Sequence, residues 1–153
     1  MPTFRRADWY ETPHYYDILL DEDNARDADF LEALLARYGA TNGRRVLEPA
    51  CGSGRLLVEL ARRGWEVTGL DLSEPMVRYA RQRLAQEGLA GEVLHAPMQG
   101  FDLSGRFDLA HCLVSTFKYL LDERTARDAL GCVARALRPG GVFALGLHLT
   151  DYA

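Results

Sequence analysis

Cysteine is too scarce in this chain of 153 residues to support a disulfide framework or a zinc site. Only Cys51, Cys112 and Cys132 are present, and no two of them form a Cys-x-x-Cys pair. An odd number of cysteines without that spacing indicates neither kind of cross-link. The sequence therefore predicts no metal centre, and it favours a reducing compartment, the cytoplasm.

Strong charge of one sign and long apolar runs are also missing. The 18 basic and 22 acidic side chains give a net charge of -4, and Lys118 is the only lysine. A basic field for nucleic acid is therefore not expected. No apolar segment approaches the ~20 residues that cross a bilayer. Met1 to Arg6 lead into acids and aromatics rather than into an apolar leader. Neither nucleic acid nor a membrane is predicted as a partner.

Apolar residues recur instead in alternating strand-like and helix-like patterns. Strands are expected at 46–49, 66–70, 92–95, 106–112 and 142–148, and helices over 26–38, after the turn at residue 54, after Ser73 and after Asp122. Ser73 and Asp122 are good N-cap residues. This alternation predicts a doubly wound α/β fold, with a mainly parallel sheet, helices on both faces and right-handed crossovers.

Three of these helices have predicted core faces. For helix 26–38 the face comprises Phe30, Leu31, Leu34, Leu35 and Tyr38. After Ser73 it comprises Met76, Val77, Ala80 and Leu84, and after Asp122 it comprises Ala126, Leu130, Val133, Ala134 and Leu137. Each face is expected to pack on the sheet.

The most informative segment is Val46 to Arg55, which reads Val-Leu-Glu-Pro-Ala-Cys-Gly-Ser-Gly-Arg. An apolar strand ends in an acid and enters a Gly-x-Gly turn, and a helical pattern follows at once. Gly52 and Gly54 let the backbone approach a ligand closely, and the new helix presents unpaired N–H groups there. A second strand ends at Asp71, close to the ~20-residue offset at which an acid meets a ribose diol. The segment therefore predicts a nucleotide site.

Two features separate this site from a dinucleotide site. Leu56 and Leu57 occupy the region of the third glycine of that fingerprint, and the carboxylate of Glu48 would repel a pyrophosphate. A carboxylate suits an ammonium group. The two acids therefore fit a nucleoside that bears an amino acid, with Glu48 toward its amino group and Asp71 toward its ribose. S-adenosylmethionine is such a molecule.

These segments resemble the class I S-adenosylmethionine-dependent methyltransferases. Val46 to Gly54 resembles the first motif of that family, and Val67 to Asp71 resembles the second. Phe107 to Cys112 is similar to the fourth strand, and Leu137 to Gly141 to the turn before the fifth. The resemblance covers about residues 14–148 and rests on four motifs in the family's order. It implies a Rossmann-like sheet of order 3-2-1-4-5, with the cofactor at the carboxyl ends of strands 1 and 4.

The resemblance also implies how S-adenosylmethionine is held. Leu72 and Met76 would flank the adenine, and Met98 would contact it through its backbone N–H and its thioether. Pro97 stands where the family usually offers an acid to the adenine amino group. The implied cofactor-binding set is Tyr16, Glu48, Ala50, Gly52, Gly54, Arg55, Asp71, Leu72, Met76, Pro97, Met98 and Cys112.

Tyr16 belongs to a segment, residues 1–24, that related enzymes fold as a lid over the cofactor. Residues 25–153 would form the binding domain itself. Arg55 is expected either to be a solvated residue of the first helical turn or to pair with a carboxylate, that of Glu48 or that of the methionine part.

The implied reaction is in-line displacement of a methyl group from a sulfonium, which depends mainly on alignment and desolvation. His111 and Tyr119, expected in the loop after the fourth strand, are candidates for a general base. That strand lacks the Asn-Pro-Pro-aromatic pattern of adenine or amide methylation, and it lacks the Pro-Cys pair of cytosine methylation. A small-molecule acceptor is therefore predicted. A non-catalytic domain that binds S-adenosylmethionine or S-adenosylhomocysteine, and an NAD-type dinucleotide binder, remain open.

The fifth expected strand, Val142 to His148, is apolar on both faces, as an interior strand would be. Only Leu149 to Ala153 follow, whereas the family adds another helix and two more strands. No bulge, proline or charge protects this edge. The sequence therefore predicts either a fragment that lacks strands 6 and 7 and part of the acceptor pocket, or pairing of this edge with another subunit, such as a second copy of the chain.

Overall fold

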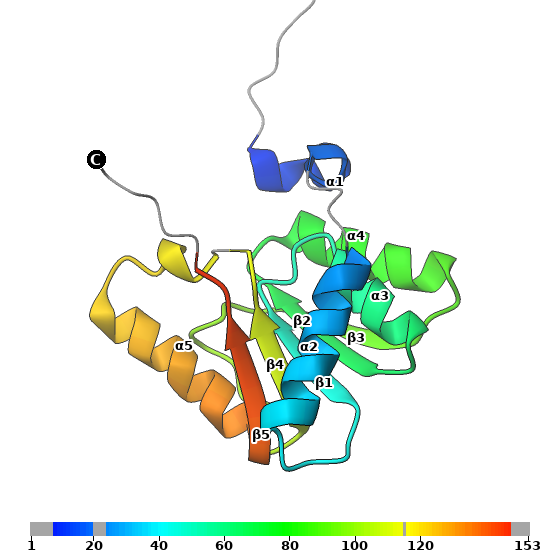
Figure 1. Cartoon of the computed structure of the whole chain (residues 1–153). Coiled ribbons are helices and arrows are strands. Elements are labelled where there is room, and N and C mark those ends of the chain that lie inside the picture. The colour runs from blue at the N-terminus through cyan, green and yellow to red at the C-terminus, as the bar shows by residue number, and fades with distance from the viewer. Residues whose placement is uncertain (1–7, 20–23, 115, 148–153) are drawn as a thin grey trace, which may run out of the picture.

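A computed structural model describes residues 8–19, 24–114 and 116–147. Five parallel strands form one sheet in the order β3-β2-β1-β4-β5 (Figure 1). The strands are β1 (Arg45–Pro49), β2 (Glu66–Asp71), β3 (Gly91–His95), β4 (Phe107–Cys112) and β5 (Leu137–Leu145). The helices are η1 (Trp9–Glu11), α1 (Pro13–Leu19), α2 (Asn24–Tyr38), α3 (Arg55–Arg62), α4 (Glu74–Gln86), η2 (Thr116–Tyr119) and α5 (Glu123–Ala136), of which η1 and η2 are short 3-10 helices. The predicted fold class and strand order are confirmed.

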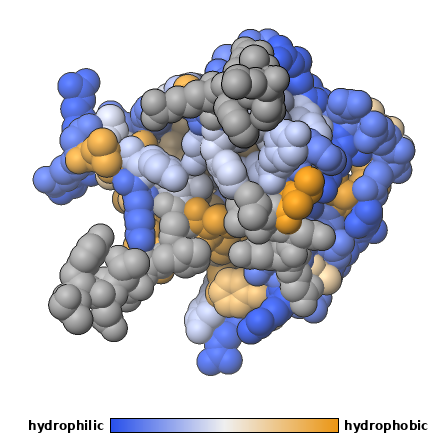
Figure 2. Space-filling view, turned by 90° about the horizontal axis from the view of Figure 1, so that it is seen from above, coloured by the Kyte–Doolittle hydropathy of each residue, from blue (hydrophilic) through white to orange (hydrophobic). Residues whose placement is uncertain are grey.

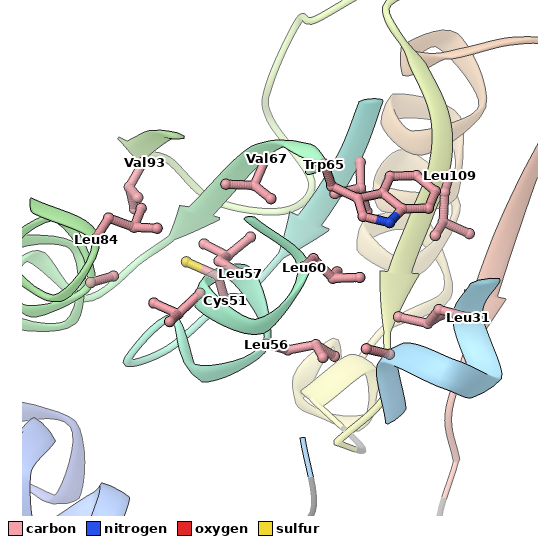
Figure 3. Close-up of a cluster of buried hydrophobic side chains, with 14 of the residues drawn as sticks. Leu31, Cys51, Leu56, Leu57, Leu60, Trp65, Val67, Leu84, Val93 and Leu109 are labelled. Carbon is pink, nitrogen blue, oxygen red and sulfur yellow. The ribbon is translucent and has the colours of Figure 1, made fainter. Parts of the chain in front are cut away.

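Helices cover both faces of the sheet. On one face α2, α3 and α4 bury apolar side chains against Val46, Val67 and Leu109. Figure 3 shows this cluster, in which Leu57 and Leu60 of α3 lie among side chains from the neighbouring strands and helices. On the other face, α5 packs against Leu47 and Ala110. Because both faces are covered, the central strands read as nearly continuous apolar runs.

Local sequence signals set several helix starts. Ser73 accepts a hydrogen bond from the N–H of Met76 at 3.4 Å, and Asp122 accepts one from the N–H of Thr125 at 2.9 Å. Both predicted N-caps are therefore confirmed. The core face predicted for α4 is also buried as expected.

Two predicted core faces were wrong in part. In α2 the buried residues are Ala28, Leu31 and Leu35, whereas Phe30 is 51% and Tyr38 66% exposed. The sequence predicts these two aromatic side chains on the buried face of the helix, whereas in the structure the small residue Ala28 packs into the core there.

The face of α5 differs in the same way. Its buried residues are Ala129, Cys132, Val133 and Ala136, spaced at i, i+3, i+4 and i+7, and Leu130 is 42% exposed. The predicted face includes Leu130 and extends the helix to Leu137, whereas in the structure Leu137 begins β5.

Strand β5 lies at an edge of the sheet, as predicted, but it starts earlier than expected. Leu137 pairs with Phe107, and the register then shifts, so that Val142 pairs with Leu109. Pro139, which has no backbone N–H to donate, lies in this irregular part of the strand, where an edge strand tolerates it. The part of β5 before Val142, which lies outside the predicted strand, carries this proline and the register shift. His148 lies outside the described residues.

Candidate functional site

A pocket opens at the carboxyl ends of β1 and β4, beside the first turns of α2 and α3. It contains about 540 Å³ of empty space, part of which is open solvent. The short helices η1 and α1 stand above this end of the sheet (Figure 1). Seen from that side, apolar surface lies near the centre of the face within a mainly polar periphery (Figure 2). The lining residues include Tyr16, Glu48, Ala50, Gly52, Arg55 and Cys112 from the predicted set.

The Gly-x-Gly turn forms one wall of the pocket. Ala50, Gly52 and Gly54 have φ angles of 58°, 54° and 76°, a region that favours glycine. Gly54 also approaches α4 closely, because a Cβ there would lie 2.8 Å from the Cβ of Ala80. At Gly52, by contrast, the nearest atom to such a Cβ is Cε1 of Tyr16, at 3.9 Å. The backbone is therefore open to a ligand at Gly52 and packed at Gly54.

Asp71 organises the turn from the end of β2. One carboxylate oxygen accepts the N–H of Gly52 at 2.8 Å, and the other accepts the N–H of Ser73 at 2.8 Å. Each oxygen has two lone pairs, so each can accept one further hydrogen bond. The acid is half-buried, and it is not among the residues that line the pocket.

Glu48 presents a second acid at the end of β1. Its side chain is 14% exposed, and Oε2 is buried without a hydrogen-bond partner. Burial raises the pKa of this carboxyl well above its usual value. Arg55 opposes that shift, and Asp71 and Asp27 add to it. A cation that entered the pocket would offset the cost of ionising Glu48.

His111 lies within β4, inside the strand predicted at 106–112, and not in the loop after it where a general base is expected. Its side chain is completely buried. Burial lowers its pKa to about 3, so the imidazole is neutral. It does not line the pocket, and it is therefore not available as a base for a substrate there.

Arg55, the first residue of α3, lines the pocket opposite the start of α2. Its guanidinium lies 3.5 Å from the amide oxygen of Asn24. Asn24 and Asp27 also line the pocket, and sequence reasoning missed both. The sequence pattern predicts that this helix starts at Arg26, whereas it starts at Asn24, a residue type that favours the start of a helix.

The N-terminal helices contact the turn at several points. Asp17 of α1 accepts a hydrogen bond from the hydroxyl of Ser53 and forms an ion pair with Arg83 at 2.8 Å. The hydroxyl of Ser73 donates to the carbonyl oxygen of Tyr10 at 3.1 Å, and the hydroxyl of Tyr10 bonds that of Tyr119 at 3.2 Å. No sequence signal singled out Asp17. The division at residue 24 into lid and binding domain stays a prediction.

The residues expected around the adenine lie in different environments. Leu72 is 70% exposed, Pro97 and Met98 are half-buried, and Cys112 is buried where β4 ends. Burial raises the pKa of the Cys112 thiol to about 11. Met76 is completely buried in α4, as the core face of that helix predicts. Its contact with the adenine stays a prediction.

Comparison with known proteins identifies the family. The sequence model of a methyltransferase domain matches residues 46–141, which span β1 to the middle of β5. The chain belongs to the class I methyltransferase family. A protein named as a methyltransferase from Geobacillus sp. (strain WCH70) is 30% identical over 139 residues, covering 90% of this chain and 56% of that protein. A ubiquinone biosynthesis O-methyltransferase from Aromatoleum aromaticum is 32% identical over 135 residues, covering 87% and 54%.

Solved structures of this methyltransferase family superpose well on the chain. A sugar N-methyltransferase from a Streptoalloteichus species has a TM-score of 0.79 at 26% identity, covering 99% of this chain and 59% of that one. An amino pentose methyltransferase from Micromonospora echinaspora, solved with S-adenosylmethionine bound, has a TM-score of 0.75 at 26% identity, covering 99% and 61%. The chain spans about half the length of the curated relatives it matches.

Two kinds of feature were not found in the described residues. Within them, no helix has the length and apolar character needed to cross a membrane. In the same ranges, no three His, Cys, Asp or Glu side chains form a group that could hold a metal ion.

Proposed function

We propose that this methyltransferase domain binds S-adenosylmethionine and transfers its methyl group to a small-molecule acceptor in the cytoplasm. The observation that carries the proposal is the unpaired, buried carboxylate oxygen of Glu48 at the pocket. Ordinary folding leaves few such atoms without partners, because each costs about 1–3 kcal/mol. The ammonium group of the methionine part would supply the missing partner.

The other predicted residues fit the same ligand. The free lone pairs of Asp71 suit two ribose hydroxyls, and the open backbone at Gly52 gives the ligand a close approach. Arg55 carries the charge that suits the methionine carboxylate. Leu72, Pro97 and Met98 follow β2 and β3, on the side where the adenine would lie.

When bound, the cofactor supplies an activated methyl group on a cationic sulfur. This chain's own residues contribute alignment and exclusion of water, which lower the barrier to an in-line transfer. Val114 and Thr116, which line the pocket after β4, would face the methyl group. Two of the similar proteins are named as a ubiquinone biosynthesis O-methyltransferase and an amino pentose methyltransferase. We propose an acceptor of this general class.

A domain that binds the cofactor without turnover is the second candidate. It is favoured by the pocket lining, which contains no histidine among the described residues. We also propose that the open edge of β5 pairs with a further strand, from a longer chain or from another subunit.

Calorimetry with S-adenosylhomocysteine and with NAD tests the cofactor assignment. We expect binding of the former only, and binding of NAD alone would overturn it. Methyl transfer from labelled S-adenosylmethionine to a panel of small amines, phenols and amino sugars tests turnover. Cofactor binding without transfer to any of them would favour the second candidate.

A further inference from the structure

Four residues form one row across the sheet, just below the pocket. Glu48 of β1 lies beside Gly69 of β2, and His111 of β4 lies beside Ala144 of β5. Leu47 pairs with Ala110, so the next residues along, Glu48 and His111, are also neighbours. Two large polar side chains therefore occupy the middle of the row, and small residues flank them on both sides.

The neighbouring row is entirely apolar. It consists of Val67, Val46, Leu109 and Val142, which pack into the core under α2 and α3. A completely buried histidine one row above this core has no packing reason to be polar. The side chains of Glu48 and His111 lie next to each other in the middle of the row, whereas the space beside Gly69 is filled by Leu57 and Cys51.

Neither partner is satisfied as it stands. Both ring nitrogens of His111 and Oε2 of Glu48 are buried without hydrogen-bond partners. The closest approach is 3.9 Å, between Nδ1 of His111 and Oε1 of Glu48. A neutral imidazole has one N–H donor, and a carboxylate accepts hydrogen bonds. A shift of about 1 Å would bring these atoms to the ~2.8 Å of a charge-assisted hydrogen bond.

We infer that His111 is a positioning residue for Glu48. Its Nδ1–H donates a hydrogen bond to the carboxylate. This bond stabilises the ionised form of Glu48 and orients the carboxylate toward the ammonium group of the donor. This inference rests on the proposed function, because the ammonium belongs to the methionine part of S-adenosylmethionine. His111 touches neither the donor nor the acceptor.

The arrangement couples binding to a proton. Burial holds the Glu48 carboxyl protonated in the empty pocket to a higher pH than usual. The cation favours the ionised form, so Glu48 gives up its proton on binding. Burial also lowers the pKa of His111 to about 3, so the proton passes to solvent and not to the imidazole. The other titratable or charged groups that act on Glu48 or feel its charge are Tyr16, Asp27, Cys51, Arg55, Asp71 and Cys112.

Two ligands separate this role from a purely structural one. S-adenosylhomocysteine carries the ammonium group, and 5′-methylthioadenosine is the thioether nucleoside without the amino-acid part, so it lacks both the ammonium and the carboxylate. At neutral pH, His111→Leu should weaken S-adenosylhomocysteine binding by about tenfold or more, the worth of a hydrogen bond to a charged group. It should leave methylthioadenosine binding unchanged. The loss should shrink as the pH rises and Glu48 ionises unaided.

His111→Asn is the matched variant, because its side-chain amide offers a donor near the position of Nδ1. We expect it to restore most of the affinity for S-adenosylhomocysteine. An equal loss for both ligands in His111→Leu, or no loss for either, would overturn the inference.

A measurement on the unaltered protein decides the question if these variants do not fold. The ¹⁵N shifts of the His111 ring with S-adenosylhomocysteine bound should report the neutral Nδ1–H tautomer, and an Nε2–H tautomer would contradict the inference. Failure of the proposed function looks different, because the wild-type chain would then bind neither ligand.

Discussion

Two buried acids, Asp108 and Glu48, lie at opposite ends of the neighbouring strands β4 and β1. Asp108, at the amino end, accepts the N–H of Arg45 at 2.9 Å and lies 3.3 Å from the guanidinium of Arg138. Glu48, at the carboxyl end, has one oxygen with no partner and another 3.9 Å from a neutral imidazole. The first acid forms an ion pair with Arg138, although its Oδ1 also has no hydrogen bond, and the second lies beside a neutral histidine at the pocket. We therefore expect a ligand cation to take at Glu48 the part that Arg138 takes at Asp108.

The largest effect is expected on stability, when Asp108, the acid that is paired with Arg138, is replaced. Asp108→Ala would leave the N–H of Arg45 and the charge of Arg138 without their partner. We expect the free energy of unfolding to fall by about 3 kcal/mol, less than for a fully enclosed pair because Arg138 is 36% exposed. Urea denaturation followed by circular dichroism measures this loss. Asp102→Ala, in an exposed loop, is the matched control, and an equal loss there would remove the distinction.

Replacement of Asp71, at the carboxyl end of the sheet, should lower the affinity for the ligand. Asp71→Ala would remove two charge-assisted hydrogen bonds to the ribose, each worth about 1.5–3 kcal/mol before water compensation. We expect calorimetry to show at least about a tenfold loss of S-adenosylhomocysteine affinity. The variant also frees the N–H groups of Gly52 and Ser73, so its circular dichroism must be compared with wild type. Unchanged affinity in a folded variant would contradict the assignment.

Glu48→Gln should lower the affinity for the ligand and raise the stability of the fold. The folded-state pKa of Glu48 is raised by burial, so the contribution of this side chain to stability is most favourable below about pH 4.5, the usual value for the group. That contribution is lost as the pH rises and the buried carboxyl is forced to ionise. We expect the variant to melt higher than wild type above that pH and to match it below. Glu74→Gln, at an exposed ion pair, should show no such divergence.

The smallest effect is expected at the adenine side. Pro97→Asp would restore an acceptor for the adenine amino group and should tighten S-adenosylhomocysteine binding about fivefold, the worth of one net hydrogen bond. Pro97→Ala controls for loss of the ring alone. Equal affinities for the two variants would show that the adenine is held differently.

Local patterns in the sequence predicted much of the fold. Ser73 and Asp122 were recognised as N-caps because a side-chain oxygen there meets orphan N–H groups nearby in the chain. The Gly-x-Gly turn was recognisable for a similar reason, since Gly52 and Gly54 need φ angles that other residues avoid. The core faces of α2 and α5 were less predictable. Periodicity does not show whether a large or a small residue, such as Ala28, fits against a particular sheet.

The sequence by itself determined the order of strands and helices, the turn, and the two acids that follow β1 and β2. Each of these depends on residues that are near one another in the chain. Only the tertiary structure decided that His111 lies buried beside Glu48 and that Asp17 reaches Ser53 and Arg83. Those contacts join segments far apart in sequence, and strand register and burial, which no local pattern encodes, bring them together.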